Sequence, residues 1–176
     1  MKKFNFISLV LPILFVLFYS NAIAETKIAI VEIDYLIKNS IAGKSFIKEL
    51  DKLNKNNIKF FEENNKKLNL EKEKIAKQKN ILSNEEYNKK VKSLNDEFKK
   101  YKNDSDKKIR SLQKKRDKGM NKILSELKIV LSEYSDQNKL TFIIDQKNII
   151  IGRSDLNVTQ EVLKKLNNKI KKITLN

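Results

Sequence analysis

One feature of this sequence constrains its fold more than any other: in residues 44–135, sparse apolar residues recur mostly at intervals of three and four. The pattern is clearest in the second half of the stretch, at Tyr87, Val91, Leu94, Phe98, Tyr101, Ile109, Leu112, Met120, Ile123, Leu127, Val130 and Tyr134. Such spacing, without any Pro, is typical of helices that pack along a heptad seam. We therefore expect long helices here rather than a globular core.

A helix boundary divides this stretch near its middle. Ser83 is a favourable N-cap residue, and Glu86 lies three residues further on, which is the pattern of a capping box. We expect one helix to end near Leu82 and the next to begin near Asn84, with the tip at residues 82–84. A join this short returns the chain antiparallel to itself.

Two independent apolar patterns fall into one register when the hairpin closes at this tip. Leu68 then faces Phe98, whereas other levels mix polar with apolar residues, as where Asn57 faces Ile109. The alternative is a disordered charged segment, and the agreement between the two halves argues against it. The expected arm has a thin seam and should bend readily.

The N-terminus has the three parts of a secretory signal peptide. Met1-Lys2-Lys3 is a short positively charged region, an apolar run follows it, and the small residues Ala22 and Ala24 precede Glu25. A retained membrane anchor is the alternative, but the apolar run is short for a span, which needs about 20 residues. We expect residues 1–24 to be removed by cleavage after Ala24 and the mature chain to work outside the cytoplasm.

Two compact apolar segments flank the helical stretch. Residues 27–33 predict one strand, and residues 140–151 predict a β-hairpin with a turn at 145–148. Residues 154–170 begin with a capping Ser or Asp and predict a last helix. The head is therefore split into residues 25–43 and 136–176. Three short strands and one helix form a small core, so we expect association through the strands.

A Gly-Lys-Ser sequence at residues 43–45 follows the first apolar run, as in a nucleotide-binding loop. Such a loop needs an earlier Gly, and Lys38 occupies that position. ATP and GTP are also scarce outside the cytoplasm. The chain has no His and no Cys, which excludes a zinc site or a nucleophile pair built from them. We expect no enzymatic activity, catalytic residue, metal, cofactor or nucleotide.

The formal net charge of +16 implies an anionic partner. It is densest between Lys99 and Lys118, where ten basic residues accompany three acidic ones. A composition biased towards Lys by an AT-rich genome explains part of this excess. A basic nucleic-acid-binding coiled coil and a structural spacer of the envelope are alternative functions. The signal peptide argues against the first, and the β-rich head argues against the second.

The order and spacing of these segments resemble the Skp (OmpH-like) periplasmic chaperones of Gram-negative bacteria. The resemblance covers the whole chain. The segments on which the resemblance rests are the signal peptide, "KIAIVEID" at 27–34, Ala42-Gly43-Lys44, the basic hairpin, "FIID" at 142–145 and "DLNVTQEVLKKL" at 155–166. The resemblance implies a mainly α fold with a small β-rich head, in which a long antiparallel coiled-coil hairpin projects from a β-strand trimerisation domain.

The resemblance also implies a function. A periplasmic homotrimer would act as an ATP-independent holdase and shield unfolded outer-membrane proteins in a basic cavity between its arms. Lipopolysaccharide or an anionic membrane surface stays open as a further partner, with no residue of this chain matched to it. One departure from the family pattern is Asn157-Val158, which separates Leu156 from Thr159 and predicts a shift of the last helix by a turn.

Three sets of residues are candidate sites. The client-binding candidates are Phe60, Phe61, Tyr87, Phe98, Tyr101, Lys99, Lys100, Lys102, Lys107, Lys108, Arg110, Lys114, Lys115, Arg116 and Lys118. The trimer-interface candidates, all in the predicted strands, are Ile28, Ile30, Phe142, Ile144 and Ile150. Gly43 and Gly119 are expected at one cross-section of the arm base, where they are the candidate hinge.

Overall fold

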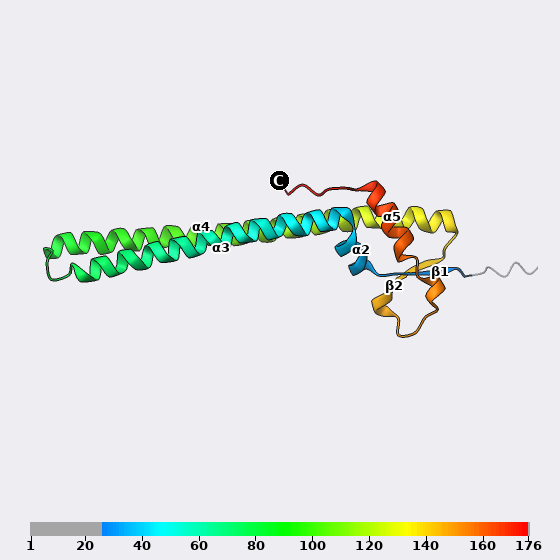
Figure 1. Cartoon of the computed structure of the whole chain (residues 1–176), viewed down its shortest axis with the longest axis horizontal. Coiled ribbons are helices and arrows are strands. Elements are labelled where there is room, and N and C mark those ends of the chain that lie inside the picture. Colours follow the sequence, from blue (N-terminus) through cyan, green and yellow to red (C-terminus); the bar gives the residue numbers. More distant parts are fainter. Residues whose placement is uncertain (1–25, 176) are drawn as a thin grey trace, which may run out of the picture.

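The computed structural model describes residues 26–175 and shows a small head from which one long two-helix arm projects (Figure 1). The expected signal peptide, residues 1–24, lies outside the described residues. The elements run in the order β1, α2, α3, α4, β2, α5, with two short 3-10 helices between β2 and α5. The prediction of a mainly α chain with a small β-rich head is confirmed.

Helices α3 (Ile41–Lys77) and α4 (Asn84–Asn138) form the arm and run antiparallel. Ser83 caps α4 with the predicted capping box: its hydroxyl accepts from the Glu86 N–H at 3.3 Å, and the Glu86 carboxylate accepts from the Ser83 N–H at 3.1 Å. Helix α3 ends earlier than expected. Residues 78–83 form the tip because the chain must cross the roughly 8–10 Å that separates two packed helices.

The seam is thin, and one predicted pair is wrong. Leu68 and Ile75 are buried, but Phe98, expected opposite Leu68, is 56% exposed. At this level Tyr101 is the half-buried residue of α4, and its hydroxyl donates to the Phe61 carbonyl oxygen at 3.4 Å. Phe98, three residues earlier on the same helix, is the more exposed of the two.

The head contains a two-stranded parallel sheet of β1 (Ile28–Val31) and β2 (Phe142–Asp145). Parallel strands need a long crossover connection, and the whole arm provides it here. The predicted β-hairpin over residues 140–151 is wrong. The chain instead turns into a 3-10 helix, Gln146–Asn148, whose start is capped by the Asp145 carboxylate accepting from the Lys147 N–H at 3.4 Å. In this chain residues 149–151 form no strand.

The Gly-Lys-Ser sequence belongs to a sharp corner between two helices. Helix α2 (Ile33–Asn39) ends one residue before Ser40, whose buried hydroxyl caps α3 by accepting from the Gly43 N–H at 3.0 Å. Gly43 is therefore in the first turn of α3, where an added Cβ would lie 1.6 Å from the Ile37 carbonyl oxygen. The sequence motif is explained by this corner.

The last helix, α5 (Thr159–Lys169), begins later than residue 154. Ser154–Leu156 form a 3-10 turn instead, and the Asn157 side chain accepts from the Thr159 N–H at 2.9 Å. Thr159 is itself buried, and its hydroxyl accepts from the Glu32 N–H at 2.9 Å, which ties the start of α5 to the end of β1. Helix α5 therefore begins at Thr159, and a shift of this helix relative to the family pattern stays a prediction.

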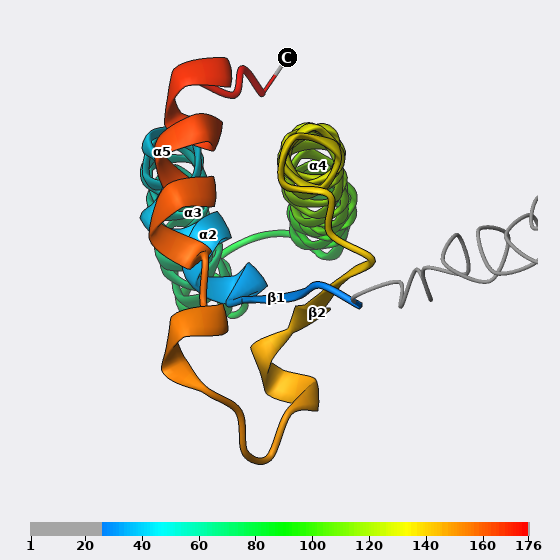
Figure 2. The ribbon, with the colours of Figure 1, turned by 90° about the vertical axis from the view of Figure 1, so that its right-hand side faces the viewer.

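The core lies where the arm enters the head. Viewed along the arm, α5 and the two strands lie on different sides of α4 (Figure 2). After α5 the chain runs back towards the arm and continues to bury apolar side chains. The buried cluster is Val31, Leu36, Ile37, Ala42, Phe46, Ile123, Leu127, Val130, Tyr134, Val162, Leu166, Ile170, Ile173 and Leu175. Helix α4 therefore serves both parts, with its second half in the head core and its first half in the arm.

Candidate functional site

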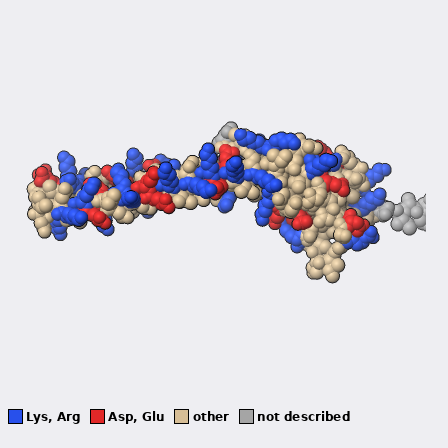
Figure 3. Space-filling model, in the orientation of Figure 1, with Lys and Arg blue, Asp and Glu red and all other residues tan. Residues whose placement is uncertain are grey.

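Basic side chains cover much of the visible arm surface, with scattered acidic ones between them (Figure 3). Of the ten basic residues in 99–118, eight are exposed. The other two are half-buried: the Lys108 ammonium lies 4.5 Å from the centre of the Phe60 ring, and the Lys115 ammonium donates to the Leu175 carbonyl oxygen at 2.7 Å. The exposed eight are Lys99, Lys100, Lys102, Lys107, Arg110, Lys114, Arg116 and Lys118. They form a solvated cationic surface. This surface attracts anionic partners, and salt weakens the attraction.

Three of the five predicted aromatic residues gather at one level of the arm. The rings of Phe60 and Phe61 meet edge to face with centres 5.9 Å apart, and Phe60 lies 6.1 Å from Tyr101. Tyr87 is half-buried near the tip, and Phe98 is exposed on α4. The aromatic residues are therefore one cluster and two separate side chains, each with some ring surface in reach of solvent.

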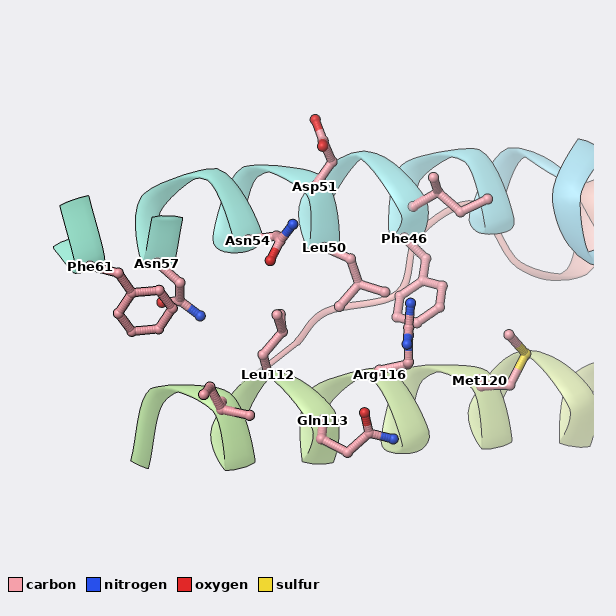
Figure 4. Close-up of a pocket in the computed structure, with 12 residues that line it drawn as sticks. Phe46, Leu50, Asp51, Asn54, Asn57, Phe61, Leu112, Gln113, Arg116 and Met120 are labelled. Atoms are coloured by element: carbon pink, nitrogen blue, oxygen red, sulfur yellow. The ribbon is translucent and has the colours of Figure 1, made fainter. Parts of the chain in front are cut away.

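A hollow between α3 and α4 was not predicted. It has a volume of about 550 Å³ and lies on the head side of the aromatic cluster, between Phe46 and Phe61 (Figure 4). We name it the seam pocket. Its lining is Phe46, Ile47, Leu50, Asp51, Asn54, Asn57, Phe61, Ile109, Leu112, Gln113, Arg116 and Met120. The mixed level of Asn57 and Ile109 is the sequence signal that could have found it, because a short polar residue opposite an apolar one leaves space.

The predicted interface residues of the head differ in exposure. Phe142, the first residue of β2, is 58% exposed, and Ile150, on the segment that projects from the head between β2 and α5 (Figure 1), is 99% exposed. Ile28 is 37% exposed, Ile144 is half-buried, and Ile30 is buried within this chain. The head therefore presents exposed apolar side chains, and among the described residues β2 pairs only with β1, which leaves its other edge available to another chain.

Both candidate hinge glycines are in tight contacts. Besides the corner at Gly43, an added Cβ at Gly119 would lie 2.2 Å from an atom of the Phe46 ring. Both residues lie at the arm base, as expected, and neither has a positive φ. Close packing is thus a sufficient reason for Gly at each position, and a hinge there stays a prediction.

Within residues 26–175, no cluster of acidic side chains could hold a metal ion. Among the helices of the same residues, none is both long and apolar enough to span a membrane.

The chain is similar to proteins of one family. A family model described as "Outer membrane protein (OmpH-like)" matches residues 27–166. No curated protein matches the chain. Among solved structures, a candidate outer membrane chaperone (OmpH-like) from Caulobacter crescentus has a TM-score of 0.79 at 14% sequence identity, covering 87% of this chain and 90% of the other. At this identity the likeness shows a shared fold.

Proposed function

The chain belongs to the OmpH-like outer membrane protein family, and from this premise we propose that it is a periplasmic chaperone of unfolded outer-membrane proteins. It acts as a holdase without ATP, keeping clients from aggregating until they are delivered. The predicted signal peptide supports export to the periplasm. The family match and the fold it shares with the Caulobacter protein support a chaperone role.

The observation that carries the proposal is the composition of the arm surface. Exposed Lys and Arg residues supply long-range attraction, and half-exposed aromatic rings supply short-range apolar contact. Lys side chains add apolar surface along their stems while their ammonium groups stay solvated. Many weak, adaptable contacts of this kind suit an unfolded chain, which has no fixed shape to match.

We further propose that three chains associate through their heads, so that the arms surround a cavity. The exposed Phe142 on β2 and Ile150 on the segment after it support this, because exposed apolar side chains of this kind commonly mark an interaction site. Arms joined only at their heads can separate at their tips, which suits clients of different size.

A direct test is light scattering of a urea-unfolded outer-membrane protein diluted into buffer with residues 25–176. We expect suppression of aggregation without nucleotide, and weaker suppression as salt is raised. A denatured basic protein is the control client and should be protected less. Failure to protect the outer-membrane protein at low salt would contradict the proposal.

A further inference from the structure

We infer that the seam pocket receives an apolar side chain of a bound client segment, and that Arg116 pairs with a carboxylate on the same segment. The inference rests on the proposed function, because it concerns how an unfolded chain is held. It places one contact within a single arm, between α3 and α4, and separate from the cavity between arms.

The shape of the pocket suits a side chain. Phe46 and Leu50 on α3 and Leu112 on α4 point into the same space (Figure 4). The volume of about 550 Å³ lies within the roughly 300–1,000 Å³ of ordinary ligand sites. It is large enough for an aromatic or long aliphatic side chain together with part of its backbone.

The pocket is open to solvent and has an apolar rim. Ile109 and Ile47 both line it, and they are 56% and 47% exposed. At the same level α3 carries Asn57, which leaves space next to Ile109. A coiled coil selected only for stability would fill this level with a larger apolar residue. The opening therefore gives a client side chain access to apolar surface that the arm does not bury itself.

The charges of the lining favour an acidic segment. Asp51 is already paired with Lys55 at 2.7 Å. Arg116 is exposed, and within residues 26–175 no ion pair engages its guanidinium group. A guanidinium group binds carboxylates with two parallel hydrogen bonds. In Figure 4 the Arg116 side chain reaches from α4 towards Phe46, beside the apolar space.

The positive charge around the pocket favours the same acidic segment. Five of the twelve lining residues come from residues 109–120, which overlap the stretch where ten basic residues accompany three acidic ones. A client segment in which Asp or Glu flanks an apolar side chain would thus be attracted at long range through its carboxylates. The pocket would then hold its apolar side chain at short range. The occupant is an acidic peptide segment with an exposed apolar side chain.

The test uses labelled unstructured peptides and residues 25–176. The first peptide carries Phe among Asp residues, the second replaces Phe with Ser, and the third replaces Asp with Asn. We expect only the first to bind well and to shift the methyl NMR signals of Leu50, Ile109 and Leu112. A long-chain fatty acid is tested in parallel, and shifts of these signals by the fatty acid but not by the peptide would overturn the inference.

Two variants test the pocket itself. Asn57→Leu fills the space with an apolar side chain that the seam can bury, so the arm should stay folded, while affinity for the Phe-Asp peptide falls about tenfold. Its control is Asn56→Leu, at the exposed neighbouring position. Arg116→Gln should lower the affinity for the Asp peptide about threefold and leave the affinity for the Asn peptide unchanged. Its control is Lys122→Gln, which removes one exposed charge of α4 outside the pocket.

Unchanged binding to Asn57→Leu, or equal losses for Arg116→Gln and Lys122→Gln, would overturn the inference. These outcomes are distinct from failure of the proposed function. If the wild-type chain protects unfolded outer-membrane proteins and the pocket variants protect them equally well, the function stands and the pocket has no part in it.

Discussion

The ring of Phe46 on α3 occupies the space that a side chain at position 119 of α4 would need. An added Cβ at Gly119 would lie 2.2 Å from Cε2 of Phe46. The two arm helices therefore approach each other closely at this level, which also closes the seam pocket on the side of the head.

Gly119→Ala should destabilise the protein, although Ala is favoured in helices over Gly by about 0.5–1 kcal/mol. Overpacking against a buried aromatic ring costs about 1–3 kcal/mol, and because this cost exceeds the gain in helix propensity, the net change is a loss of stability. Denaturant unfolding measures the change. Combining it with Phe46→Leu should recover part of the loss, and purely additive effects of the two substitutions would contradict the packing explanation.

Tyr134 should make stability depend on pH in the alkaline range. Burial and the hydrogen bond to Glu161 at 2.6 Å raise the pKa of Tyr134 from 10.0 to about 12. Its contribution is complete below the unfolded pKa and is lost as pH rises from 10 to 12, because the unfolded state releases the proton first. The loss is at most about 2–3 kcal/mol. Tyr134→Phe should flatten the curve of unfolding free energy against pH over this window. Parallel curves for the wild type and the variant would contradict a contribution from Tyr134.

The segment after α5 should contribute strongly to stability. Ile173 is fully buried in the core at the arm base, and Ile173→Ala should cost about 2–4 kcal/mol in denaturant unfolding. Lys172→Ala, at the exposed neighbouring position, is the matched control and should change stability by less than about 0.5 kcal/mol. Equal effects at both positions would show that the segment is not packed in solution.

The head should control the oligomeric state. Phe142→Ser together with Ile150→Lys changes two side chains that are 58% and 99% exposed in one chain, so the fold should persist while the proposed trimer gives way to monomers in sedimentation velocity. Ile81→Lys, at an 81% exposed position of the arm tip, is the control and should leave the trimer intact. A trimer that survives the head substitutions would place the interface elsewhere.

The cationic surface of α4 should govern client association. Replacing the exposed Lys107, Lys114 and Lys118 by Gln should slow association at low salt more than it speeds release. The control removes the same charge from the C-terminal part of the head, at Lys164, Lys171 and Lys172. Stopped-flow fluorescence with an unfolded outer-membrane protein measures both rates. Equal slowing by the two triple variants would mean that only total charge matters.

The sequence alone determined the features that depend on neighbouring residues. The heptad spacing indicated two long antiparallel helices, and Ser83 with Glu86 located the start of α4, because a capping box is complete within one helical turn. The basic character of the arm also follows directly from composition. The family resemblance, based on the order of these segments, is confirmed by the match to residues 27–166.

Only the tertiary structure decided which distant segments meet. The apolar run after α4 has the composition of a hairpin, yet residues 142–145 pair in parallel with β1 across the whole arm. The exposure of Phe98 likewise depends on how α4 packs against α3, where the Tyr101 hydroxyl contacts the Phe61 carbonyl oxygen. The contact of Phe46 with Gly119, the burial of Ile173 and the seam pocket are all products of three-dimensional packing. Local propensities carry no information about such contacts, because their energy depends on partners far away along the chain.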